Sequence, residues 1–201
     1  MSAEGRKRKV ESQRLIIGIS GASGVILGIR TLEILRQIEE IETHLVMSPA
    51  AKVTIAAETN WAITDVNALA DVVHNYNDIG ASIASGSYKT MGMIILPCSI
   101  KTLSTIANSY ADNLLTRAAD VTLKEGRPLV LVVREAPLHR GHIRLMDQAA
   151  EAGAVIFPPV PAFYTKPQSI KDIVDNMVGR VLARIGIEND QYFKWKESEN
   201  S

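Results

Sequence analysis

The sequence predicts a three-layer α/β fold in which a mostly parallel sheet is doubly wound by helices on both faces. Short apolar runs that suit buried strands alternate along the chain with segments whose apolar residues recur near helical spacing. Loops rich in glycine, proline and small polar residues follow the apolar runs. The 201 residues, of which 46% are apolar, are enough for one domain with a sizeable core.

Five strands are expected, each from a short apolar run. The first ends in glycine and serine, the third (MGMIIL) precedes a proline, and the fourth (LVLVV) is continuous and largely β-branched. In chain order the five predicted strands are 14–20, 43–47, 91–96, 129–133 and 155–157.

Seven helices are expected from helical spacing and from their end signals. Ser48 followed by proline marks an N-cap, and Ser169 with Asp172 three residues on forms a capping box. Glycines end three of the later helices. After the third helix the chain is read as a glycine- and serine-rich loop as far as residue 87. In chain order the predicted helices are 25–38, 50–59, 65–70, 99–108, 112–124, 142–152 and 169–185.

The loops that follow the strands define the predicted functional edge. Right-handed crossovers between parallel strands place all of these loops at the carboxyl edge of the sheet, where ligands bind near the point at which the strand order reverses. The loops on the opposite edge, at 39–42 and 124–127, are expected to be ordinary solvated turns. The loops at the carboxyl edge begin at 21–24, 48–49, 97–99, 134–137 and 158–161.

Charge and cysteine content exclude several classes of function. Lys and Arg balance Asp and Glu at 22 each, so net charge gives no support to nucleic-acid or membrane attraction, and no apolar run is long enough to span a bilayer. The single cysteine, Cys98, rules out an internal disulfide and fits a reducing, cytoplasmic location. A basic tail over 1–13 and an aromatic tail over 188–201 are expected to flank one domain over 14–187.

The first loop at this edge favours a mononucleotide. Its glycines allow a phosphate to approach the backbone, and Ser23 adds a hydroxyl at a helix N-terminus. A dinucleotide site would have an acidic residue at the end of the second strand, where this chain has Ser48. No Gly-Lys-Ser/Thr sequence follows the loop, which excludes a P-loop. FMN, with one phosphate and a flat ring, fits better.

Other polar residues suggest a second anion site, although each has an ordinary explanation. Lys124 ends a helix, where a cation is favoured, and Arg180 is one arginine on a long helix. Two histidines three residues apart lack the cysteine or carboxylate that would complete a metal site, so no metal is expected. Cys98 is interpreted as a packing residue. The candidates for the anion site are Arg117, Lys124, Arg134, Glu135, Tyr164 and Arg180.

Six segments in order resemble the UbiX-type flavin prenyltransferases, from about Arg14 to Trp195. They are GISGASG (18–24), ETHLVMS (42–48), ASGS (84–87), ILPCSIKTLS (95–104), TRAADVTLKEGRPLVLVVREAPLH (116–139) and PPVPAFYTKPQS (158–169). The resemblance implies a flavodoxin-like, Rossmann-like fold. It also implies transfer of a dimethylallyl group from dimethylallyl phosphate to N5 and then C6 of reduced FMN, without a metal. The product, prenylated FMN, would serve a UbiD-type decarboxylase, and the assembly would be a homo-oligomer, often a dodecamer.

The same resemblance assigns roles to single residues of this sequence. Glu135 matches an acidic position implicated in proton movement, Glu58 matches a further acidic position of the site, and Trp195 matches an aromatic wall that a neighbouring subunit can supply. Ser23 counts among both the catalytic and the FMN positions. The prenyl-phosphate positions are Lys124, Tyr164, Arg180 and Arg117. The FMN positions are Gly21, Ala22, Ser23, Ser48, Cys98, Ser99, Ile100, Lys101 and Arg134.

Two other functions remain open at this point. An FMN carrier or chaperone for a partner decarboxylase would not need Lys124, Tyr164 and Arg180 together. A flavin-dependent peptidyl-cysteine decarboxylase shares the fold but typically uses a histidine after the first helix and an asparagine-rich clamp, where this chain has PCSIKT and PPVPAFY. The sequence leaves open whether the product serves ubiquinone biosynthesis or aromatic acid decarboxylation. Asp78-Ile79-Gly80 also stands where some members carry an aromatic residue.

Overall fold

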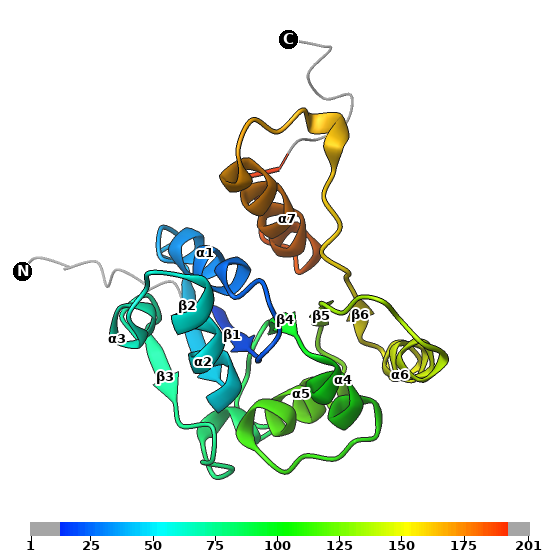
Figure 1. Ribbon diagram of the computed structural model, residues 1–201. Coiled ribbons are helices and arrows are strands. Elements are labelled where there is room, and N and C mark those ends of the chain that lie inside the picture. Colours follow the sequence, from blue (N-terminus) through cyan, green and yellow to red (C-terminus); the bar gives the residue numbers. More distant parts are fainter. Residues whose placement is uncertain (1–12, 193–201) are drawn as a thin grey trace, which may run out of the picture.

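The computed structural model describes residues 13–192, which form a doubly wound α/β fold around one six-stranded sheet (Figure 1). Every pairing in the sheet is parallel, and the strand order is β3-β2-β1-β4-β5-β6. The predicted fold class is therefore confirmed. The strands are β1 (Gln13–Ile19), β2 (Ile41–Met47), β3 (Val72–His74), β4 (Gly92–Cys98), β5 (Leu129–Val133) and β6 (Val155–Ile156).

Seven α-helices and two short 3-10 turns connect these strands within the described residues. The predicted caps are present, since Ser48 accepts a hydrogen bond from the Ala51 amide and Ser169 with Asp172 forms a capping box. None of these helices is long and apolar enough to cross a membrane. The helices are α1 (Ile26–Leu35), α2 (Pro49–Glu58), α3 (Ile63–Asn67), α4 (Ile100–Ala107), α5 (Leu114–Lys124), α6 (Arg140–Glu151) and α7 (Ile170–Arg184), and the turns are η1 (Ser82–Ala84) and η2 (Phe163–Thr165).

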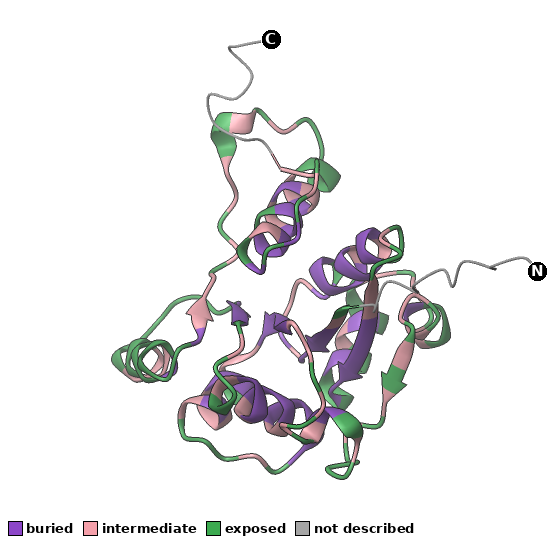
Figure 2. Ribbon diagram, turned by 180° about the vertical axis from the view of Figure 1, so that it is seen from behind, coloured by how far each residue is buried: buried purple, intermediate pink, exposed green. Residues whose placement is uncertain are grey.

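Two apolar cores cover the two faces of the sheet, because successive strand residues point to opposite sides. On β1, Leu15, Ile17 and Ile19 pack with α1, α2, α3 and α7, whereas Ile16 packs with α4, α5 and α6. Figure 2 shows that the central strands are buried, whereas the connection from β6 to α7 is mostly exposed. The helices thus form the outer two of three layers.

The structure contains one strand that the sequence did not predict, at the outer side of the sheet. Val72–His74 forms the sixth strand, β3, in a segment that the sequence analysis had interpreted as a loop. It pairs with β2 over three residues only and is incompletely buried. Two valines beside a histidine, none of them fully buried, give no apolar run that marks a strand, so only its pairing with β2 reveals it. The turn predicted at 39–42 is also shorter, because β2 begins at Ile41.

A histidine pair joins β3 to β2. His44, only 1% exposed, lies with Nδ1 2.9 Å from His74 Nε2 and with Nε2 2.7 Å from Glu42 Oε1. Burial and the neighbouring His44 ring lower the pKa of His74, against an opposing effect of Asp78. The contact that joins β3 to β2 therefore involves His74 in its neutral form.

We expect the wild-type protein to lose stability as the pH falls below about 6.5, the ordinary pKa of an unfolded histidine. Because the pKa of His74 is lower in the folded protein, the unfolded chain takes up a proton first, and acid favours unfolding. Urea unfolding between pH 8 and pH 5.5 measures this, with His74→Gln as the comparison. The variant should show a shallower pH dependence; equal slopes would show that His74 does not carry the effect.

Candidate active site

The loops after β1 and β4 meet where the strand order reverses, since β1 lies between β2 and β4. Ser20 joins them: its hydroxyl donates to the Pro97 carbonyl at 2.9 Å and accepts from the Ser99 amide at 2.7 Å. The sequence predicts Ser20 only as the last residue of the first strand, with no role in the site. The signal that the sequence offered was a serine at the end of a strand, beside a loop of the kind that binds cofactors. This signal does not reveal the contact, because the carbonyl that Ser20 binds lies 77 residues away.

Two glycines bring α1 and α2 close to this point. A Cβ atom on Gly21 would lie 2.3 Å from the Cβ of Ala50, so the glycine loop rests on the first turn of α2. A Cβ on Gly28 would lie 2.6 Å from the Leu96 carbonyl oxygen, so α1 packs directly against β4. Close approach of backbone to backbone requires glycine at both positions.

Glu58, the last residue of α2, binds the start of α1. Its Oε2 accepts hydrogen bonds from the amides of Gly24 at 2.8 Å and Val25 at 3.4 Å. Partial burial acts to raise the pKa of Glu58, but hydrogen bonds from Ser23 and the two amides, with the charge of Arg134, outweigh it and lower the pKa. A carboxylate therefore occupies the N-terminus of α1, where the sequence suggested a phosphate.

Two other helix N-termini at this edge remain available to an anion. Ser48 and Ser99 cap α2 and α4 through the amides of Ala51 and Thr102. Early amides of α4, including Lys101, have no acceptor inside the helix. A groove of about 530 Å³ between α4 and α6 adjoins this turn and is lined partly by Ile100, Lys101, His139 and His142.

The loop after β5 lies beside the loop after β4. The Arg134 amide donates to the Cys98 carbonyl at 3.1 Å, and the side chains of Arg134 and Glu135 are exposed. Cys98 itself is fully buried, and burial raises the pKa of its thiol well above the ordinary value. The interpretation of Cys98 as a packing residue is therefore confirmed, since a buried thiol is a poor nucleophile.

Lys124 lies at the opposite edge of the sheet from Arg134. Lys124 ends α5 before β5 begins, whereas Arg134 follows the last residue of β5. At about 3.3 Å per residue, β5 alone separates them by about 17 Å. The Lys124 ammonium donates to Glu125 Oε1 at 2.5 Å and lies against Gly86 of the ASGS motif. Arg117, on the same helix, pairs with Asp120 at 2.8 Å.

Tyr164 and Arg180 lie on the connection that follows β6 and on the helix α7 to which it leads. Tyr164 lies in η2 and is 50% exposed, and the Arg180 guanidinium lies over the Phe157 ring, 5.9 Å from its centroid. Val160 and Phe163 of the same connection are 68% and 72% exposed. Trp195 falls outside the described residues, as do the basic tail apart from Gln13 and most of the aromatic tail.

The structure thus separates the predicted prenyl-phosphate residues, on α5, η2 and α7, from the predicted FMN residues. The FMN positions, with Glu58 and Glu135, gather at the carboxyl edge, while Lys124 stands at the other edge of the same chain. Among residues 13–192, no group of three or more potential metal ligands occurs. His139 accepts from the Gly141 amide and caps α6, which gives that histidine a structural role.

This doubly wound fold, with glycine and serine loops meeting at the switch point, defines a flavoprotein of the mononucleotide-binding class. The Flavoprotein family model matches residues 4–182. Flavin prenyltransferase UbiX of Escherichia coli strain K12 is 61% identical over 92% of this chain and 98% of the relative. The corresponding enzyme of Thauera aromatica is 56% identical over 92% and 95%. The chain belongs to the UbiX family of flavin prenyltransferases.

Solved structures agree with this assignment. AnUbiX (PadA1), crystallised with FMN and dimethylallyl pyrophosphate, is 49% identical, with a TM-score of 0.90 over 92% of this chain and 98% of that one. A dodecameric FMN-dependent UbiX-like decarboxylase from Escherichia coli O157:H7 gives the same identity and TM-score over 92% and 100%. The peptidyl-cysteine decarboxylase EpiD is 21% identical with a TM-score of 0.58, over 75% and 83%, which shows the shared fold alone.

Proposed function

We propose that this protein transfers a dimethylallyl group from dimethylallyl phosphate to reduced FMN. The C–O bond of the donor breaks with release of phosphate as N5 of the flavin bonds to the prenyl group and gives up its proton. The prenyl double bond then takes up a proton, and its tertiary carbon bonds to C6, which gives up a proton in turn. The observation that carries the proposal is the convergence of Ser23, Glu58 and Arg134 at the switch point. Membership of the prenyltransferase family supplies the reaction class.

We assign FMN to the carboxyl edge. Because Glu58 binds the amides at the start of α1, the flavin phosphate is better served by the first turn of α4, Ser48 and the Arg134 guanidinium. These groups fit a phosphate monoester, since they combine free amides, a hydroxyl and a cation. The full set remains Gly21, Ala22, Ser23, Ser48, Cys98, Ser99, Ile100, Lys101 and Arg134, with the backbone of Cys98 as the contacting group.

The donor phosphate needs cations and a phenol hydroxyl to stabilise the charge that develops as the C–O bond breaks. Lys124, Tyr164, Arg180 and Arg117 have this chemistry. Because Lys124 lies at the far edge of its own sheet, we propose that neighbouring copies of the chain complete each site in a homo-oligomer. The dodecameric relative and the exposed apolar side chains of the β6–α7 connection support this arrangement.

We assign the proton transfers of the reaction to Glu58, Ser23 and Glu135. The lowered pKa of Glu58 keeps it ionised near neutral pH, so it can accept a hydrogen bond from Ser23 and orient that hydroxyl. Glu135, exposed just past β5, or the released phosphate can take the proton lost before ring closure. Trp195 would provide an electron-rich wall for the developing allyl cation.

Two further assignments complete the proposal. A UbiD-type decarboxylase is proposed as the recipient of prenylated FMN, because the modified flavin is the reaction's product and needs a consumer. A cytoplasmic location is proposed because the single thiol of Cys98 is buried and unpaired, as in proteins of reducing compartments.

The test is anaerobic incubation with reduced FMN and dimethylallyl phosphate, followed by mass analysis of the released flavin. A flavin heavier by one prenyl unit would establish the transferase. FMN that stays unchanged with both the phosphate and the diphosphate donor, yet copurifies with the protein, would instead identify an FMN carrier. A matched incubation without the donor controls for copurified product.

A further inference from the structure

Arg180 lies on α7, a helix whose principal neighbour within the described residues is α1 (Figure 1). The apolar side of α7, which includes Val178 and Leu182, packs into the core on this face of the sheet. Apolar contacts alone fix the position of a helix less sharply than directional polar contacts. The directional polar contacts of α7 therefore add to its apolar packing in setting the position of the backbone at Arg180.

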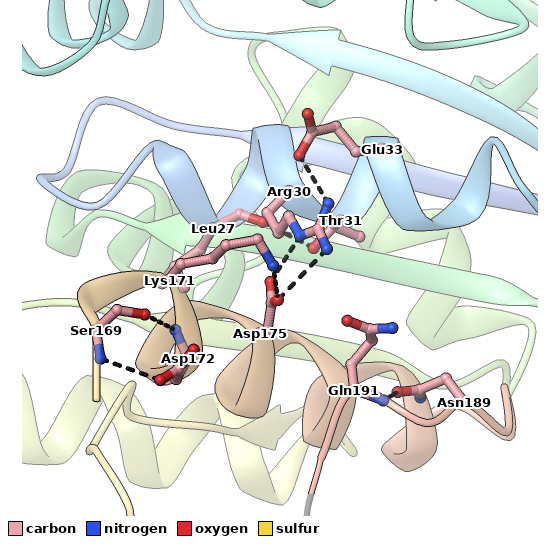
Figure 3. A network of polar contacts seen from close by, with 10 residues as sticks. All are labelled: Leu27, Arg30, Thr31, Glu33, Ser169, Lys171, Asp172, Asp175, Asn189 and Gln191. Carbon is pink, nitrogen blue, oxygen red and sulfur yellow. Dashed lines mark hydrogen bonds and ion pairs between the residues drawn. The ribbon is translucent and has the colours of Figure 1, made fainter. Parts of the chain in front are cut away.

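One of these contacts is an ion pair between α1 and α7, drawn in Figure 3. Arg30 Nε lies 2.6 Å from Asp175 Oδ1, and Arg30 Nη2 lies 3.4 Å from Oδ2. The two side chains are only 23% and 13% exposed, so water screens the pair weakly. Arg30 also binds Glu33 at 3.1 Å, and the ammonium of Lys171 binds Asp175 from the exposed side.

A second contact fixes α7 next to Arg180. Asn189 Nδ2 donates to the carbonyl of Gly179, the residue before Arg180, at 3.0 Å. A Cβ on Gly179 would lie 2.9 Å from the backbone nitrogen of Tyr192, so the turn after the helix rests directly on this residue. Figure 3 shows Asn189 and Gln191 beside the end of α7. Arg180 thus directly follows two anchored points, Asp175 and Gly179, on one helix.

We propose that Asp175, through its ion pair with Arg30, is a positioning residue for Arg180. The inference rests on the proposed function, in which Arg180 binds the donor phosphate. Asp175 lies five residues before Arg180, about 7.5 Å along a helix. Without the pair, α7 keeps its apolar face but loses its directional contact with α1. A displacement of about 1 Å at a phosphate-binding group is enough to cost about 100-fold in rate.

The experiment compares Asp175→Ala and Asp175→Asn with wild type by the KM for dimethylallyl phosphate, kcat and the Kd for FMN. The matched control is Lys171→Met, which removes the exposed partner of Asp175 and leaves Arg30 in place. We expect a KM at least tenfold higher for Asp175→Ala, a smaller rise for Asp175→Asn, and changes under twofold in FMN affinity. The exchanged pair, Arg30→Asp with Asp175→Arg, should recover only part of the loss, because the exchanged charges would meet the like charges of Glu33 and Lys171.

Three outcomes would overturn the inference. An unchanged KM in Asp175→Ala would show that Arg180 needs no such support. Parallel losses of FMN affinity and donor KM in both Asp175 variants would indicate general loosening of the fold. An equal effect in Lys171→Met would show that surface charge is responsible. Wild type is assayed first. Absence of prenyl transfer in wild type counts against the proposed function, whereas a loss confined to the variants concerns Asp175 alone.

Discussion

Arg180→Ala is expected to reduce prenyl transfer by about 100- to 1,000-fold, the usual cost of removing one donor from a developing negative charge. Binding of FMN should stay within twofold of wild type. The Arg180 side chain is exposed, and within residues 13–192 its guanidinium contacts the Phe157 ring and forms no ion pair. Truncation therefore removes an anion ligand and costs at most about 1 kcal/mol of stability.

Donor turnover by mass analysis and FMN titration by fluorescence measure the two effects separately. Arg184→Ala, one turn later on α7 and also exposed, is the matched control and should behave as wild type. Arg180→Lys should recover only part of the rate, because an ammonium lacks the planar fork of a guanidinium. Equal loss of FMN binding and prenyl transfer in Arg180→Ala would contradict the assigned role.

Gly28→Ala is expected to lower stability and FMN affinity together. The new Cβ would lie 2.6 Å from the Leu96 carbonyl oxygen and 2.8 Å from Ile19 Cδ1, so α1 must move away from β1 and β4. Overpacking of this kind costs about 1–3 kcal/mol, and the better helix propensity of alanine offsets about 1 kcal/mol. For a chain of this size each net kcal/mol lowers Tm by about 2–4 °C.

Thermal melting at one protein concentration and FMN titration measure both effects. The matched control is Gly80→Ala in an exposed loop, where the nearest atom to a new Cβ would be Asp78 Oδ1 at 3.4 Å. That variant should melt with wild type. An unchanged Tm and FMN affinity in Gly28→Ala would mean that α1 does not set the position of the glycine loop.

Local signals accounted for most of the fold. Ser48 and Ser169 were recognisable as caps because each hydroxyl binds an amide three residues ahead, and such contacts do not depend on the rest of the chain. Four strands of five to seven residues were recognisable as runs of mostly buried residues, and the two-residue β6 because it lies in an apolar run between Gly153 and Pro158. The edge strand β3 was missed because its three residues acquire strand structure only by pairing with β2.

The candidate site likewise combines features that the sequence predicts with contacts that only the fold shows. Parallel strands with right-handed crossovers place all the loops that follow the strands at the same edge of the sheet. The structure has these loops there, at 21–24, 48–49, 97–99 and 134–137. The hydroxyl of Ser20 and the carboxylate of Glu58 were beyond sequence reasoning, because their partners lie 77 and 34 residues away. The family resemblance named Glu58, but only the fold shows it bound to the start of α1.

The sequence by itself determined the alternation of strands and helices, the edge that carries the polar loops and the family to which the chain belongs. These are encoded in short segments whose periodicity, caps and motifs act locally. The same rule of parallel strands with right-handed crossovers already places Lys124 across the sheet from Arg134. Tertiary structure alone decided that Glu58 fills the N-terminus of α1 and that Arg30 anchors the helix of Arg180, because the partners in these contacts lie 34 and 145 residues apart in the chain and only the folded path brings them together.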